Sequence, residues 1–191
     1  MAEVQTIAVI GAGPVGRGIA QLAAQAGYRT ILEDLLPNAL RRAESEIRGQ
    51  LDRAVDSGGV TAEAAQLAFS RLEFADSVED AARQADLVIE AVPEELESKI
   101  EIFTLLDKIC RPGTILASQL SSLSITEISR VTYRARNCLG MHFAEPVDRE
   151  KRLEIIRGRE TDDETLATAL EVGRRMGKEV VVTEDTACGP V

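Results

Sequence analysis

The chain has 191 residues, a formal net charge of −10 and a hydrophobic fraction of 45%, which suffices for one domain of ordinary size with its own core. The acidic balance argues against nucleic acid and anionic membrane surfaces as partners. No apolar run is long enough to cross a bilayer, and the N-terminus lacks the features of a signal peptide. We therefore expect a cytoplasmic protein. The three scattered cysteines predict neither a disulfide framework nor a metal site; they are Cys110, Cys138 and Cys188.

Apolar strands and amphipathic helices alternate along the chain. Short apolar runs bounded by glycine, proline or polar residues predict strands at 4–10, 29–33, 87–92, 114–117, 138–143, 152–156 and 179–183. Helical spacing of apolar residues predicts helices at 14–26, 37–68, 95–109 and 162–176, with a short helix from 124. The alternation predicts an α/β fold, a doubly wound and mainly parallel Rossmann-type sheet.

The helical stretch after the second strand is longer than a plain crossover needs. The sequence Ser57-Gly58-Gly59 interrupts it, and Thr61 is of a residue type that is preferred at the N-cap of a helix. We therefore expect a helical hairpin insertion at about residues 37–70.

The first two predicted strands enclose a Gly-x-Gly-x-x-Gly turn followed by a helix. Gly11 permits the tight turn, Gly13 lets the backbone approach a pyrophosphate, and Gly16 lets the helix lie close on the sheet. The free N–H groups and the dipole of that helix face the phosphates. Asp34 follows the second strand, where a carboxylate binds the ribose hydroxyls and favours NAD over NADP. The predicted NAD-binding residues of this segment are Gly11, Gly13, Pro14, Val15, Gly16 and Asp34.

The second half of the chain carries a candidate acid–base pair. His142 is the only histidine, and it lies at the end of a predicted strand, where open α/β sheets place their ligands. Glu154 lies in the next predicted strand. A carboxylate beside the imidazole would fix its tautomer and stabilise the imidazolium that forms when histidine accepts a proton. Oxidation of an alcohol by NAD needs such a base.

Several motifs in addition to the glycine turn point to one family. They are Ala-Asp-Leu-Val-Ile-Glu-Ala-Val-Pro-Glu at 85–94, Ser-Ser-Leu-Ser-Ile-Thr-Glu-Ile at 121–128, Gly-Met-His-Phe at 140–143 and Glu-Ile-Ile-Arg-Gly at 154–158. With these motifs the chain resembles the NAD-binding domain of the L-3-hydroxyacyl-CoA dehydrogenases from Thr6 to about Asp185. The resemblance implies reversible oxidation of a 3-hydroxyacyl thioester to the 3-ketoacyl form. It also implies that the helical hairpin meets part of coenzyme A.

The resemblance assigns roles to five residues. It implies that His142 is the general base and that Glu154 orients it. It implies that Ser121 contacts the substrate 3-oxygen and the nicotinamide region. It further implies that Glu94 and Lys99 contact the cofactor.

The chain departs from the family around its histidine. Ala144-Glu145-Pro146 stands where the family usually has Phe-Asn-Pro, so an acceptor-only anion replaces an active-site amide that helps to orient substrate. We expect Glu145 to lie at the substrate, where its charge would oppose the reduction of a ketone. The segment 148–152 is heavily charged, where the family has an apolar loop.

The family continues beyond this point into an all-helical domain that covers the substrate and forms the dimer. Here the segment 185–191 ends the chain where that crossing is expected. We therefore predict a single NAD-binding Rossmann-type domain over residues 1–191, without the helical domain. A helical partner domain or a homo-oligomer would then complete the cleft.

Three interpretations follow. The first is an NAD-dependent dehydrogenase of 3-hydroxyacyl thioesters. The second is a dehydrogenase of a small free 3-hydroxy acid. The third is a catalytically weak NAD-binding module, or a subunit that needs a helical partner. The retained His142, Glu154 and Ser121 favour catalysis, whereas Glu145 and the missing helical domain favour the third interpretation.

Overall fold

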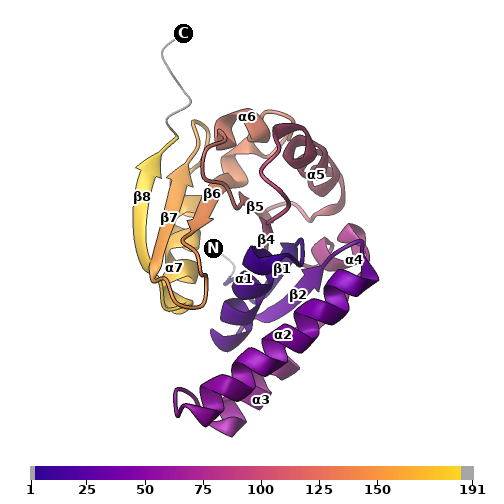
Figure 1. Cartoon of the computed structure of the whole chain (residues 1–191). Coiled ribbons are helices and arrows are strands. Elements are labelled where there is room, and N and C mark those ends of the chain that lie inside the picture. The colour runs from indigo at the N-terminus through magenta and orange to yellow at the C-terminus, as the bar shows by residue number, and fades with distance from the viewer. Residues whose placement is uncertain (1–2, 186–191) are drawn as a thin grey trace.

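The computed structural model describes residues 3–185, which form one eight-stranded sheet with helices on both faces (Figure 1). The strand order is β3-β2-β1-β4-β5-β6-β7-β8. All neighbouring strands are parallel except β6 and β7, which are antiparallel. The predicted doubly wound, mainly parallel sheet is therefore confirmed. The strands are β1 (Thr6–Ile10), β2 (Arg29–Glu33), β3 (Leu72–Ala75), β4 (Leu87–Glu90), β5 (Ile115–Ser118), β6 (Cys138–Phe143), β7 (Arg152–Arg157) and β8 (Glu179–Glu184).

The helices connect the strands and divide between the two faces of the sheet. They are α1 (Pro14–Gln25), α2 (Pro37–Asp56), α3 (Ala62–Ser70), α4 (Val78–Ala82), α5 (Leu96–Ile109), α6 (Ile125–Ser129) and α7 (Asp163–Arg175), with a single 3₁₀ turn η1 (Ala135–Asn137). Buried side chains of α1, α2, α3 and α7 share one apolar core, and those of α4, α5 and α6 share the other.

Successive side chains of a strand point to opposite faces of the sheet, and this alternation produces the two cores. In β1, Ile7 and Val9 belong to the core under α1, whereas Ala8 and Ile10 belong to the core under α4 and α5. All four side chains are at most 1% exposed. A strand that is covered on both faces must be apolar throughout, which explains the continuous apolar run that predicts it.

The helices α2 and α3 form the predicted hairpin, and they lie side by side at the β2 end of the molecule (Figure 1). The Thr61 hydroxyl caps α3 by accepting a hydrogen bond of 3.1 Å from the Ala64 backbone N–H. Ile47 and Leu51 bury the inner side of α2 against the sheet core.

No helix or strand is predicted between residues 71 and 86, where the structure has β3 and α4. Both are short, four and five residues. An edge strand and a helix of a single turn contain too few apolar repeats to produce a periodic signal. Ser77 caps α4 through a hydrogen bond from the Asp80 N–H, and this N-cap is the local signal that identifies the helix.

Two of the cysteines, Cys110 and Cys138, are small buried residues of the core. Burial raises the pKa of the Cys110 thiol to about 11 and that of the Cys138 thiol to about 12. Cys188 and the chain end at 186–191 lie outside the described residues.

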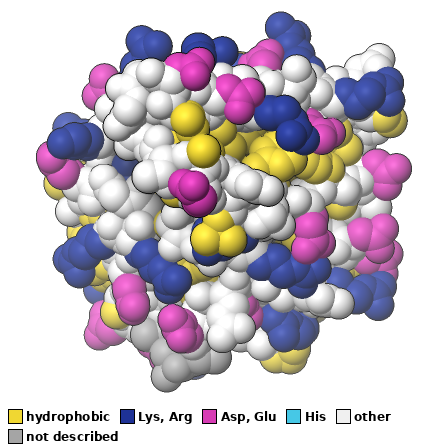
Figure 2. Space-filling view, turned by 90° about the horizontal axis from the view of Figure 1, so that it is seen from below, with side chains coloured by type: hydrophobic (Ala, Val, Ile, Leu, Met, Phe, Trp, Pro, Cys, Tyr) yellow, Lys and Arg dark blue, Asp and Glu magenta, His cyan; other side chains and the backbone are white. Residues whose placement is uncertain are grey.

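No helix within residues 3–185 combines the length and the apolar character that a membrane crossing requires. On the face drawn in Figure 2, acidic and basic side chains are interspersed, with hydrophobic side chains exposed between them.

Candidate active site

The strand order reverses between β1 and β4, and a cavity of about 680 Å³ opens at the carboxyl ends of the strands at that point. Its wall contains the ends of β1, β2 and β4, together with Gln119 just beyond β5. Open α/β sheets bind their ligands in this position. Seven predicted site residues line the cavity: Gly11, Gly13, Pro14, Val15, Asp34, Glu94 and Glu145.

The glycine turn fits a pyrophosphate. Gly11 has φ of +104°, and a Cβ there would lie 2.9 Å from the Ala91 carbonyl oxygen. A Cβ on Gly16 would lie 1.8 Å from the Gly11 carbonyl oxygen, so only glycine lets α1 approach the turn. A Cβ on Gly13 would meet no atom within 4 Å, because this position faces open space. The turn therefore leaves room for a ligand at Gly13, at the N-terminus of a 12-residue helix.

Asp34 links the second strand to this turn. Its Oδ2 accepts a hydrogen bond of 3.0 Å from the Ala12 N–H, and its Oδ1 accepts one of 2.9 Å from the Leu36 N–H. The carboxylate is half-buried in the cavity wall, beside the turn. An acid that is fixed by backbone groups in this place can still accept hydrogen bonds from a ribose, since each oxygen has a second lone pair. Turn, helix and acid thus fit NAD.

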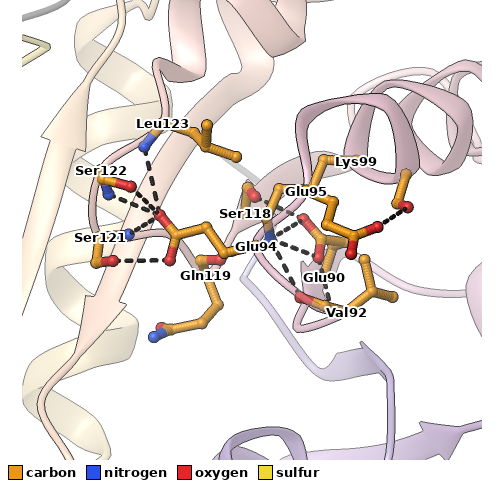
Figure 3. Close-up of polar contacts among 11 residues, drawn as sticks. Glu90, Val92, Glu94, Glu95, Lys99, Ser118, Gln119, Ser121, Ser122 and Leu123 are labelled. Atoms are coloured by element: carbon orange, nitrogen blue, oxygen red, sulfur yellow. Dashed lines mark hydrogen bonds and ion pairs between the residues drawn. The ribbon is translucent and has the colours of Figure 1, made fainter.

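Glu94 connects the cavity to the loop that follows β5 (Figure 3). It accepts hydrogen bonds from the hydroxyl and N–H groups of both Ser121 and Ser122, and from the Leu123 N–H, at 2.7 to 3.3 Å. Partial burial of Glu94 works against ionisation, but the hydrogen bonds from Ser121 and Ser122 outweigh it and lower its pKa to about 2. The carboxylate therefore holds the predicted substrate serine, Ser121, next to the cavity.

Lys99 lies behind the cavity wall, with its side chain completely buried. Its ammonium group donates hydrogen bonds of 2.8 and 3.0 Å to the carboxylate of Glu90, which is also completely buried. It also donates to the carbonyl oxygens of Val92 and Gln119, at 3.4 and 2.8 Å. The Ser118 hydroxyl also donates a hydrogen bond to the Glu90 carboxylate (Figure 3). The predicted contact of Lys99 with the cofactor stays a prediction, because in this structure its ammonium group fixes the loops after β4 and β5.

His142 and Glu154 face each other across β6 and β7. They are direct partners in the antiparallel register, and the distance from Nδ1 to Oε2 is 3.5 Å. The His142 side chain is 35% exposed and the Glu154 side chain 22% exposed, so water reaches both. The Nη2 atom of Arg152 also lies 3.8 Å from the same Glu154 oxygen. The structure thus brings the predicted acid–base pair together.

Gln119 joins this pair to the cavity, a role that the sequence analysis does not assign. Its side chain lies in the cavity wall, and its Oε1 accepts a hydrogen bond of 2.9 Å from the N–H of Phe143, the residue after His142. Its role depends on the pairing of β5 with β6, which no local pattern reveals.

Comparison with known proteins gives concordant results. The NAD-binding domain of the 3-hydroxyacyl-CoA dehydrogenases matches residues 6–186. A probable 3-hydroxybutyryl-CoA dehydrogenase of Bacillus subtilis is 41% identical over 96% of the chain, and a 3-hydroxybutyryl-CoA dehydrogenase of Bradyrhizobium diazoefficiens is 40% identical over 96%. The crystal structure of 3-hydroxybutyryl-CoA dehydrogenase from Escherichia coli K12 has a TM-score of 0.94, with 36% identity over 96% of this chain.

These relatives are longer than the present chain. It spans 63% of the Bacillus protein, 62% of the Bradyrhizobium protein and 39% of the Escherichia coli chain. The similarity therefore concerns the NAD-binding part of each relative.

Proposed function

The chain belongs to the 3-hydroxyacyl-CoA dehydrogenase family through its NAD-binding domain, and from this premise we propose that it transfers hydride between NAD and the 3-hydroxy or 3-keto group of an acyl thioester. The observation that carries the proposal is the His142–Glu154 pair, which Gln119 joins to the cofactor cavity. A domain that only binds NAD has no use for a base next to its cavity.

The proposed base is Nε2 of His142. Because Nδ1 faces Glu154 at 3.5 Å, Nε2 is the nitrogen left for the substrate, and it accepts the proton of the 3-hydroxyl group as the C3–H bond breaks. NAD, when bound, supplies the hydride acceptor. In the reverse direction the imidazolium returns the proton to the ketone oxygen. Glu154 stabilises the imidazolium and acts as a positioning residue.

Ser121 is proposed to contact the same substrate oxygen. In this structure its hydroxyl donates to Glu94, at 2.7 Å between the oxygens. Because the proton of the substrate hydroxyl goes to His142, the Ser121 hydroxyl would turn from Glu94 and donate its hydrogen bond to the substrate oxygen. The coordination by Glu94 keeps this serine in one position, which reduces the entropy that orientation of the substrate would otherwise cost.

The exposure of the His142 and Glu154 side chains favours a second proposal for the same site. Catalysis improves when the reacting groups are shielded from water. We infer that a helical segment, from a partner or from a second copy of the chain, covers the pair in the working enzyme. Activity per subunit that rises with protein concentration supports a second copy, whereas activity that is independent of concentration argues against it.

The test of the function is NADH oxidation by the purified chain with acetoacetyl-CoA. His142→Ala should lose about 10²- to 10⁴-fold in kcat, the usual contribution of a general acid–base group, with unchanged NADH affinity. Glu154→Gln should lose less. Glu179→Gln, on the outer strand β8, is the matched control and should keep full activity.

Three results would separate the interpretations. Turnover with 3-hydroxybutyrate and NAD, but none with the thioester, would favour a small-acid dehydrogenase. Tight NADH binding with no turnover of either substrate would favour a binding module. Turnover of the thioester that survives His142→Ala would exclude the proposed base.

A further inference from the structure

Glu33, the last residue of β2, carries a carboxyl group without a partner in the described part of the chain. The residue is 2% exposed, and its Oε1 is buried with no hydrogen bond from any group of residues 3–185. Burying an acceptor without a partner costs free energy, so such atoms are rare in folded proteins and indicate a missing ligand, a water or a function. Glu33 lies in the wall of the cofactor cavity.

The position of Glu33 in the cavity is close to where the adenosine end of the cofactor would bind. It directly precedes Asp34, the acid that is placed for a ribose, and lies on the strand next to the glycine turn that accepts the pyrophosphate. The base beyond that ribose is adenine. Apolar side chains of Val78, Val92 and Ile102 line the same cavity, and such side chains can pack on a flat aromatic base.

We propose that Glu33 is a cofactor-recognition residue whose protonated carboxyl group binds the edge of the adenine base of NAD. A protonated carboxyl presents one O–H donor beside one carbonyl acceptor. Adenine presents an amino donor beside a ring-nitrogen acceptor. Donor meets acceptor at both positions, so both carboxyl oxygens of Glu33, including the unpartnered Oε1, would have a hydrogen-bond partner in the adenine base. The proposal rests on the NAD-binding assignment and assigns a residue to its adenosine end.

The charges around Glu33 favour its protonated form. Burial is the main cause that raises the pKa of Glu33. The charges of Asp34, directly after β2, and of Asp76, between β3 and α4, act in the same direction, and together these effects raise the pKa to about 7. Glu94 and Glu145 line the same cavity, and no lysine or arginine is found among its described lining residues. Nothing here stabilises an ionised Glu33.

Ionisation would therefore weaken binding. It removes the O–H donor and places a further negative charge close to Asp34 and to the pyrophosphate. Affinity should be highest below pH 7 and should fall as the pH rises through 7. If only the protonated form binds, the change between pH 6 and pH 8 is about tenfold.

The experiment measures the Kd of NADH and of ADP-ribose by titration calorimetry between pH 6 and 8. ADP-ribose lacks nicotinamide, so its binding reports the adenosine end and is separated from His142. We expect the affinity of the wild type for both probes to fall about tenfold from pH 6 to pH 8. Glu33→Gln keeps a donor and an acceptor without titrating, and should bind tightly at every pH. Glu33→Leu should bind weakly at every pH.

A charge control completes the design. Asp76→Asn removes one of the two acids that face Glu33, and should move the midpoint of the affinity profile to lower pH. Glu73→Gln should leave it unchanged, because Glu73 pairs with Arg29 on the exposed edge of β3. Wild-type affinity that is independent of pH, or Glu33→Leu that binds as the wild type does, would overturn the proposal. Failure of the wild type to bind NADH at any pH would instead overturn the cofactor assignment on which it rests.

Discussion

Glu94 holds Ser121 at two atoms although 27 residues separate them in the chain: its Oε2 accepts the serine hydroxyl at 2.7 Å and its Oε1 the serine N–H at 2.9 Å. The contact joins the loop after β4 to the loop after β5 (Figure 3). Charge-assisted hydrogen bonds of this kind are stronger than neutral ones. The carboxylate thus fixes the loop that presents the proposed substrate serine.

Glu94→Gln should therefore impair catalysis more than folding. The amide has one acceptor oxygen in place of two. Its NH₂ group would face the N–H and O–H donors whose hydrogen bonds the carboxylate accepts. We expect kcat/KM for acetoacetyl-CoA to fall about tenfold, equivalent to one hydrogen bond to a charged group, in steady-state assays. Glu95→Gln is the control, because within residues 3–185 the Glu95 carboxylate hydrogen-bonds only to Ser98 in the adjoining helix α5. Equal losses in both variants would contradict the assigned role.

The low pKa of Glu94 also predicts how stability depends on pH. Its pKa is about 2 in the folded chain and 4.5 ordinarily, so the folded state favours the ionised form. This contribution is complete above pH 4.5 and is lost as the pH falls toward 2. In urea unfolding, the wild type should be more stable than Glu94→Gln at pH 5 and should lose that advantage by about pH 2. A difference that stays constant with pH would exclude the assignment.

The fold is predictable from the sequence where the signals are local. The prediction of β2 at 29–33 agrees with the structure, and Thr61 caps α3 as expected, because strand periodicity and N-cap chemistry each depend on a few adjacent residues. The missed β3 and α4 are stabilised by their neighbours in the sheet, which a short segment does not encode by itself.

The same distinction between local and non-local signals holds for the residues of the site. The glycine turn and Asp34 are contiguous motifs and lie where the sequence places them. The burial of Glu33 and of the Glu90–Lys99 pair is not predictable from the sequence, because charged residues are expected at the surface. Their burial depends on which strands lie side by side, and that order is a property of the whole sheet.

Glu145→Asn should accelerate ketone reduction. Glu145 is exposed and lines the cofactor cavity. In the proposed reaction its charge would oppose the negative charge that develops on a ketone oxygen. Replacing it by the amide of the family should raise kcat for acetoacetyl-CoA by up to about tenfold, a moderate value for a solvent-screened charge. Asp148→Asn, an exposed acid on the same loop that does not line this cavity, is the control. An unchanged or lower rate in Glu145→Asn would show that Glu145 does not act on the reacting oxygen.

The second and third glycines of the turn, Gly13 and Gly16, should have different effects when changed to alanine. A Cβ on Gly16 would lie 1.8 Å from the Gly11 carbonyl oxygen, so Gly16→Ala must displace α1. Overpacking of this kind costs about 1–3 kcal/mol or more of the free energy of unfolding. A Cβ on Gly13 meets nothing within 4 Å, so Gly13→Ala should keep its stability and lose NADH affinity, since the methyl group occupies the space of the pyrophosphate.

Thermal unfolding and NADH titration of both variants distinguish these effects. Gly13→Ala with wild-type affinity for NADH would place the pyrophosphate elsewhere. Gly16→Ala with wild-type stability would show that α1 can move away from the turn without cost.

Replacing Lys99 alone should destabilise the chain more than replacing it together with Glu90. Both side chains are completely buried and joined by hydrogen bonds of 2.8 and 3.0 Å, so Lys99→Met leaves Glu90 buried without its counterion. Removing one partner of a buried pair costs about 3–5 kcal/mol, whereas apolar replacement of both is often close to neutral. Lys99→Met should therefore have the lower free energy of unfolding in urea, and Lys99→Met with Glu90→Met should recover most of the loss. Unchanged stability of Lys99→Met, with a large loss of NADH affinity, would instead show that Lys99 acts on the cofactor directly.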